Sequence, residues 1–109
     1  MRTGIARLAA TQRPGGPPIA VVVCHGRTTV QSWRSGDLAA CVPPYAEVVA
    51  ASRHAGLTVL DPQPAWLAPG IVVEDCFFPH DPHYRPAGNR LVGRWLAQQL
   101  RAEWPAIWR

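Results

Sequence analysis

The run IAVVVC at Ile19–Cys24 places the strongest constraint on how this chain can fold. It is a continuous stretch of apolar, mostly β-branched residues with no polar alternation, which is typical of a strand buried on both faces of a parallel sheet. The segment RPGGPP at 13–18 precedes it, and its prolines and glycines cannot continue a helix. The sequence therefore predicts a central strand at Ile19–Cys24, separated by a break from a short helix end before it.

A second strand, and the helix that joins it to the first, are indicated by their boundaries. Pro44 suits the first position of a helix, and Gly56 is a typical residue at a helix end. The run LTVL at Leu57–Leu60 then predicts a short buried strand. Four helix residues are expected to face inward: Tyr45, Val48, Val49 and Ser52. Together these segments form a β-α-β unit, with parallel strands and a right-handed crossover.

Further segments complete the expected secondary structure. The connection 25–43 is predicted to be a loop with one helical turn, at the carboxyl end of a strand, where open α/β sheets hold their ligands. Residues Ala65–Leu67 are expected to form one turn, and IVVEDCFF at 71–78 fits either a short edge strand or a loop anchored by its two phenylalanines. Pro86 begins an amphipathic C-terminal helix, which ends at Pro105. Its apolar face is formed by Leu91, Val92, Trp95, Leu96 and Leu100.

The composition fits a single packed α/β domain spanning residues 1–109. Hydrophobic residues make up 48% of the chain and charged residues only 17%, which favours a globular protein over a disordered one. The formal net charge is +4, but the arginines are scattered and no aromatic ladder lies between them, so no nucleic-acid partner is expected. No apolar run approaches the ~18 residues of a membrane span, and the N-terminal segment lacks the apolar region of a secretory signal. The compartment stays open.

The three cysteines give little information about function. Cys24, Cys41 and Cys76 are odd in number and widely spaced, so they form neither a C-x-x-C motif nor a disulfide framework. We expect them to behave as small buried apolar residues.

The segment FFPHDPHYRPAGNR at 77–90 places two histidines and an aspartate among aromatic residues, just before the final helix. A histidine close to a carboxylate can act as a general base, because the carboxylate accepts the Nδ1 proton, fixes the tautomer and stabilises the imidazolium. Asp81 and His83 supply these groups, and Pro82 between them lowers the entropic cost of the bend. Asp81 and His83 are therefore the candidate catalytic residues.

The order of these segments resembles the C-terminal half of the SGNH/GDSL hydrolases. The similarity runs through IAVVVC, PPYAEVVAASRHAG, LTVLD and FFPHDPHYRPAGNRLVGRWLAQQL, and covers roughly residues 19 to 101. In that family the last block carries the aspartate and histidine of a catalytic triad, followed by a glycine and a final helix. The resemblance implies a flavodoxin-like three-layer α/β/α fold, present here in part, with a short parallel sheet and the C-terminal amphipathic helix.

The resemblance also implies roles for individual residues. His83 corresponds to the general base, Asp81 to the acid that orients it, and Gly88 to the glycine of the block. One residue separates Asp81 from His83 where two are commoner, a spacing associated with branches that act on polysaccharide O-acyl groups. Arg85 and Asn89 also depart from the frequent residues at their positions. The implied substrate is an ester, such as an acylated carbohydrate or a lipid, and no cofactor is implied.

The nucleophile of the family has no counterpart in the sequence. The family's serine lies in a G-D-S block after the first strand, and the oxyanion-hole glycine and asparagine lie in two following blocks, none of which the sequence contains. Ser35 lies in the different context RSGD, and Ser32 and Ser52 have no supporting motif. We therefore expect a C-terminal fragment of an ester hydrolase that is inactive by itself. An incomplete sheet would leave an unpaired edge that favours self-association.

Two other interpretations of the loop histidines stay open. Cys76, His80, Asp81 and His83 are residue types that bind zinc or a similar ion, although their spacing matches no familiar metal motif. Alternatively, Asp81 and His83 make only local bonds to the backbone of the loop. Whether His80, or His25 at the end of the first strand, also lines a site is open as well.

The alternative function is a noncatalytic module. In this interpretation the basic surface and the tryptophans beyond the last helix, Trp104 and Trp108, engage a partner. Aromatic rings with a polar handle suit such contacts, including stacking on sugars. Sugar binding without ester turnover would distinguish this module from an enzyme.

Overall fold

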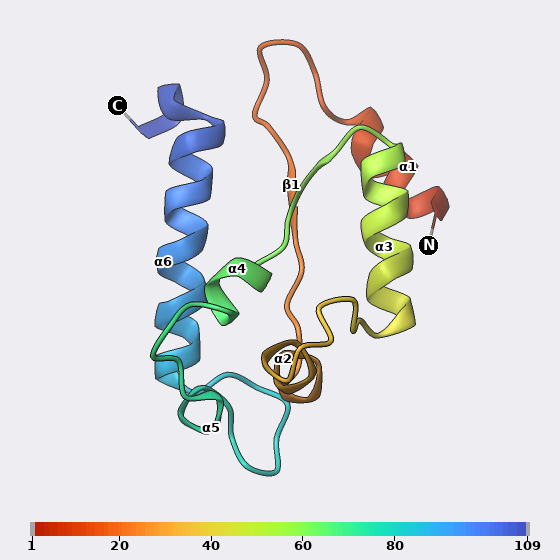
Figure 1. Cartoon of the computed structure of the whole chain (residues 1–109). Coiled ribbons are helices and arrows are strands. Elements are labelled where there is room, and N and C mark those ends of the chain that lie inside the picture. The colour runs from red at the N-terminus through yellow and green to blue at the C-terminus, as the bar shows by residue number, and fades with distance from the viewer. Residues whose placement is uncertain (1, 109) are drawn as a thin grey trace. The chain divides into compact units, whose positions relative to one another are not determined.

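The computed structural model describes residues 2–108, and the chain forms two compact units, which we treat separately. The first unit contains the segment up to Val23 and the segment Cys41–Asp61. The second contains Cys24–Ala40 and the chain from Pro62 onward. Figure 1 labels β1 and the six α-helices, which are numbered in chain order. Helices and strands are mixed, as predicted for an α/β chain, and the described strands form one parallel sheet.

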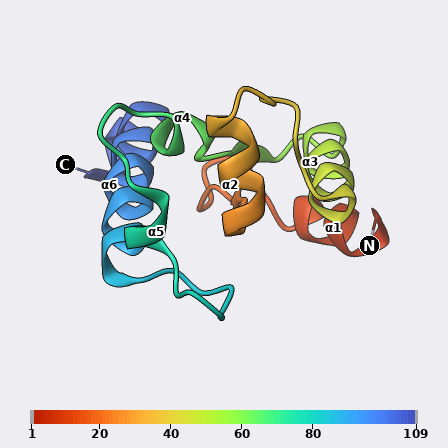
Figure 2. The same cartoon turned by 60° about the horizontal axis from the view of Figure 1, so that its bottom comes forward.

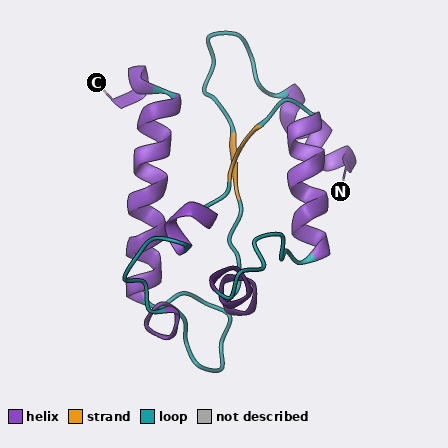
Figure 3. Cartoon of the chain, in the orientation of Figure 1, coloured by secondary structure: helices purple, strands orange, loops and turns teal. Residues whose placement is uncertain are grey.

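The first unit holds the sheet. β1 (Ala20–Val22) pairs in parallel with β2 (Thr58–Leu60), and the two strands lie side by side in Figure 3. This confirms the predicted parallel pairing. All three residues of β1 are half-buried, however, so the expected burial of Ile19–Cys24 on both faces is wrong. The reason is that, among the described residues, β2 is the one strand that flanks β1, and a two-stranded sheet leaves surface open to solvent.

The helix between the two strands has the predicted ends. α3 (Pro43–His54) begins with prolines in its first turn, and Gly56 after it adopts a φ of +81°, which suits glycine. Ser52 is fully buried, and Val48 and Val49 are half-buried. Tyr45 lies in the first turn and is 37% exposed, so the predicted inward stripe begins one turn later. The short helix α1 (Arg2–Ala10) packs against α3.

The second unit begins with a helix that is longer than the single turn expected in this connection. α2 (Arg27–Arg34) occupies part of the predicted 25–43 loop and is about two turns long. Its buried face consists of Thr29, Val30 and Trp33, and the Trp33 indole donates to the carbonyl of Ala40 at 2.7 Å. Hydroxyl and charged residues interrupt the apolar pattern of α2, so the helix depends on contacts with the rest of the unit rather than on a long periodic stripe.

The core of the second unit is aromatic. Trp66 is fully buried at the end of α4 (Gln63–Trp66) and stacks on Phe77, with ring centroids 5.1 Å apart. Tyr84 presents its ring at a steep angle to both, at 5.5 and 5.2 Å. The predicted turn at Ala65–Leu67 is thus present, although it starts two residues earlier. The remaining buried members of this cluster are Val30, Trp33, Val73, Cys76 and Val92.

The last elements hold the candidate loop between them. IVVEDCFF is not the expected edge strand, because Val73–Cys76 make a short helix, α5, and Phe77 then pairs with Tyr84. Of the two phenylalanines expected to anchor a loop here, Phe77 is buried in the core and Phe78 is exposed. α6 (Pro86–Glu103) begins and ends where predicted, and a 3₁₀ helix follows at Pro105–Trp108. On α6, Val92 is buried and the other four residues of the predicted apolar face are half-buried. Figure 2 shows the loop between α5 and α6 extending beyond both helices.

Candidate functional site

The candidate loop is the end of a small hairpin between α5 and α6. Phe77 and Tyr84 form an antiparallel bridge, and the Phe78 amide donates to the carbonyl of His83 at 3.3 Å. Residues directly opposite in an antiparallel pair project to the same face, and successive residues project to opposite faces. Phe77 and Tyr84 therefore point into the aromatic core, whereas Phe78 and His83 point outward. The pleat explains why His83 is exposed while the residue after it packs in the core.

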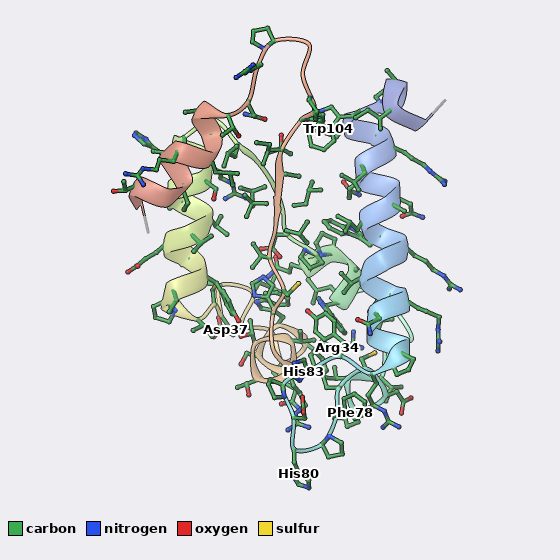
Figure 4. The ribbon with its side chains drawn as sticks, turned by 180° about the vertical axis from the view of Figure 1, so that it is seen from behind. Arg34, Asp37, Phe78, His80, His83 and Trp104 are labelled. Atoms are coloured by element: carbon green, nitrogen blue, oxygen red, sulfur yellow. The ribbon has the colours of Figure 1, made fainter. Side chains whose placement is uncertain are left out.

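Arg27 holds the base of this hairpin to the start of α2. Its guanidinium donates to the carbonyl of Pro79 at 2.9 Å and to that of Phe78 at 3.4 Å. The guanidinium of Arg85 lies 5.9 Å from the centre of the Phe78 ring, within the range of a cation–π contact. In Figure 4, Phe78 and His83 lie near the base of the loop and His80 lies at its far end. The residues nearest His83 are thus fixed from outside the loop.

Asp81 binds His83 twice. Its Oδ1 accepts the backbone N–H of His83 at 2.8 Å and also contacts Nδ1 of the ring. The backbone hydrogen bond, followed by the bond from the ring, lowers the pKa of Asp81 below its ordinary value. The carboxylate is therefore ionised at neutral pH and engages Nδ1. Within the described residues Nε2 makes no hydrogen bond, so it is available to accept a proton.

The pair lies open to solvent. The His83 side chain is 81% exposed and that of Asp81 is 54% exposed, and neither residue lines the groove along α6. No serine hydroxyl of the described residues forms a hydrogen bond with the pair. Ser32 and Ser35 donate to carbonyls of α2, at Thr28 and Gln31, and the hydroxyl of Ser52 is buried in the first unit. Residues 2–108 thus present an oriented imidazole to which no serine hydroxyl is bonded.

The other two histidines considered for the site lie in different surroundings. His80 is exposed at the end of the loop. His25 is 1% exposed, and its ring packs edge-on against Trp33 with centroids 4.6 Å apart. Its backbone carbonyl accepts the hydroxyl of Tyr84 at 2.9 Å. His25 is therefore part of the core of the second unit.

The four residues of the alternative metal site are not brought together. Cys76 is buried in the aromatic core, whereas His80, Asp81 and His83 are exposed on the loop. Within residues 2–108, no three histidine, cysteine or acidic side chains gather closely enough to hold a metal ion. Cys24 and Cys41 are exposed, so the expectation of three buried cysteines is confirmed for Cys76 alone.

Two further observations concern surfaces. None of the described helices combines the length and the apolar character that a bilayer crossing demands. Trp104 is half-buried at the end of α6, and the Trp108 side chain lies outside the described residues, so the predicted tryptophan surface stays a prediction.

Sequence reasoning did not find Arg27 or Phe78 as parts of this site. Arg27 precedes its two acceptors by 51 and 52 residues, and no local pattern indicates such a distant bond. The doublet of Phe77 and Phe78 did carry a signal, since one aromatic in the core and the next on the surface is what a strand produces.

Comparison with known proteins provides no relative from which to transfer a role: neither a family model, nor a curated protein, nor a solved structure matches the chain.

Proposed function

We propose that this chain supplies the general base and its orienting carboxylate to an ester hydrolase of the SGNH/GDSL type. The observation that carries the proposal is the contact of Asp81 Oδ1 with Nδ1 of His83, while Nε2 has no partner among the described residues. A carboxylate on Nδ1 selects the tautomer whose Nε2 can remove a proton from a hydroxyl, and it stabilises the imidazolium that results. The substrate class is an ester of a carbohydrate or a lipid.

The surroundings of the pair support this role over a purely local one. A loop residue that only satisfied its own backbone would need no support from elsewhere, yet Arg27 reaches across from α2 to hold Phe78 and Pro79. The hairpin bonds on the other side fix His83 relative to α6. Such fixation reduces the reorganisation needed when a base meets its substrate.

The mechanism needs a partner surface. In this mechanism the serine and the oxyanion donors belong to residues other than these 109. The surface that carries them covers the exposed ring of His83. The parallel unit β1-α3-β2 would then be part of the flavodoxin-like three-layer architecture of the family. Closure of the partner surface would remove water from the pair, which strengthens the electrostatic interaction between Asp81 and His83.

The first experiment measures the tautomer of His83. In the full chain with ¹⁵N-labelled histidine, at a pH where the rings are neutral, NMR distinguishes protonation at Nδ1 from protonation at Nε2. We expect Nδ1–H at His83 and Nε2–H at His80, whose ring has no side-chain partner among the described residues and which therefore serves as an internal control. Asp81→Ala makes the two rings alike. Identical tautomers in the unaltered chain would contradict the proposal.

The second experiment tests catalysis. The chain alone is expected to show little or no turnover of p-nitrophenyl acetate. Fusion of the whole chain behind the serine-bearing half of an SGNH hydrolase is expected to produce activity. His83→Ala then lowers the rate roughly 10²- to 10⁴-fold, the usual range for loss of a general base, and Asp81→Ala lowers it less. His80→Ala in the same fusion leaves it unchanged. Full activity without His83 would reject the proposal.

A further inference from the structure

The second unit contains a groove of about 520 Å³ that neither Asp81 nor His83 lines. One wall is the face of α6 that carries Ala87, Leu91 and Trp95, spaced four residues apart. The opposite wall is formed by α4, α5 and the segment between them, with Ala65 and Ile71 among its apolar residues. From Ala87 to Gln98 the α6 wall is about 16 Å long, at 1.5 Å per residue. The groove is thus a mostly apolar channel three helical turns long.

Two arginines stand along the α6 wall of this groove. Arg90 and Arg94 are one turn apart on the same helix face, and both are exposed. Neither makes an ion pair or hydrogen bond to any described residue. Asp75, which also lines the groove, is likewise without an ion-pair partner there. Like charges at this spacing destabilise a helix, so an anion placed between the two guanidiniums would relieve their repulsion and accept charge-assisted hydrogen bonds.

We propose that this groove binds a single-chain anionic amphiphile, with its acidic head on Arg90 and Arg94 and its tail along Leu91 and Trp95. The size favours a small molecule, since 520 Å³ lies within the usual range for ligand sites of about 300–1,000 Å³. Fourteen residues line the groove, fewer than the ~20–30 per side of a stable protein interface. The charge favours an anionic head, because two arginines outweigh the single carboxylate of Asp75. This site is independent of the ester hydrolase role.

The test uses the full chain and decanoate, below the concentration at which it forms micelles, in isothermal titration calorimetry. We expect one saturable site for decanoate and for decyl sulfate, and much weaker binding of decyltrimethylammonium, which has the same tail and the opposite charge. Equal affinity for the cationic and anionic amphiphiles would overturn the proposal, because the tail alone would then account for binding. Absence of saturable decanoate binding would overturn it too.

Substitutions that change the charge of the groove test where the acidic head of the ligand binds. Arg90→Gln and Arg94→Gln are each expected to weaken decanoate binding about tenfold, the effect of one lost charge-assisted hydrogen bond. Asp75→Asn is expected to tighten decanoate binding, because it removes a negative charge that repels the carboxylate of decanoate. Arg53→Gln removes the same positive charge from α3, in the first unit, and is expected to leave the affinity unchanged.

A fifth substitution changes the volume of the groove and leaves its charge unchanged. Ala68→Leu adds volume inside the groove and is expected to weaken decanoate binding while the circular dichroism spectrum stays the same. Unchanged affinity in the double variant of Arg90 and Arg94, with its helical spectrum intact, would reject the assignment of the head site.

Discussion

Gly88 lies directly against the backbone carbonyl of Cys76. A Cβ at position 88 would be 2.4 Å from the Cys76 oxygen, so no other residue fits without a shift of backbone. The same carbonyl accepts the amide of Arg85 at 2.9 Å. The absence of a side chain at Gly88 therefore allows the start of α6 to approach α5 and to close the hairpin that carries Asp81 and His83.

Substitution of Gly88 should lower stability although alanine favours helices. We expect Gly88→Ala to decrease the free energy of unfolding by about 1–3 kcal/mol, the usual cost of overpacking. The control is Gly93→Ala on the same helix, where a Cβ would meet nothing within 4 Å. There alanine should raise stability by about 0.5–1 kcal/mol. Urea denaturation of both variants measures the difference, and changes of the same sign would contradict this account.

Loss of the arginine that holds the hairpin should loosen the loop without unfolding the chain. In Arg27→Ala, the carbonyls of Phe78 and Pro79 lose their donor. We expect faster hydrogen exchange at the Phe78 amide, which bonds His83, while amides in the middle of α6 keep their protection. Arg53→Ala, a change on α3, serves as the control. Equal exchange rates at Phe78 with and without Arg27 would show that the bond does not restrain the loop.

The order of the loop should depend on pH in the acid range. The pKa of Asp81 is lowered from its ordinary value of 3.8 by its bonds from His83. A lowered pKa means that the folded chain prefers the ionised carboxylate, so this contribution is present above about pH 3.8 and is lost as the pH falls through the folded-state value. An NMR titration of the Asp81 carboxylate should give a midpoint below 3.8. In His83→Ala the midpoint should move up, and a midpoint at or above the ordinary value in the unaltered chain would contradict the contact.

The three thiols should differ in reactivity. Cys24 and Cys41 are exposed, whereas Cys76 is buried, and burial followed by the nearby charge of Asp75 raises the pKa of the Cys76 thiol. A chain carrying both Cys24→Ser and Cys41→Ser should react with Ellman's reagent only after denaturation. Because the folded pKa is raised, the neutral thiol contributes stability below pH 9.0 that is lost as the pH rises above it. Rapid labelling of Cys76 in the native chain would show that the core of the second unit opens easily.

Ser52 offers a test in the first unit. It is fully buried on α3, and its hydroxyl has no hydrogen-bond partner in the described residues. An unsatisfied buried hydroxyl costs free energy, so Ser52→Ala should raise the free energy of unfolding by about 1 kcal/mol. Ser35→Ala, at an exposed position after α2, should change it by less than about 0.5 kcal/mol. Destabilisation by Ser52→Ala would indicate a hydrogen bond that forms in solution.

The local sequence was sufficient for the elements whose signals lie within a few residues. The β-branched run near Val21, the prolines before α3 and α6, and the glycine after α3 each act on their own backbone, so β1, α3, β2 and α6 appear close to their predicted bounds. The proximity of Asp81 to His83 was predictable for the same reason, because the two residues are separated by a single proline that restricts the turn between them.

The tertiary structure decided which parts of those elements are buried and whether the side chains of the candidate site face the core or the solvent. α2 forms because Val30 and Trp33 find a core built from residues beyond Pro62, and the hairpin is fixed by Arg27 from 51 residues away. His83 faces solvent because Tyr84, the next residue in the pleat, is drawn into contact with Trp66 and Phe77. Local periodicity does not predict such contacts, because the burial of a residue depends on distant residues that come close to it only in the folded chain.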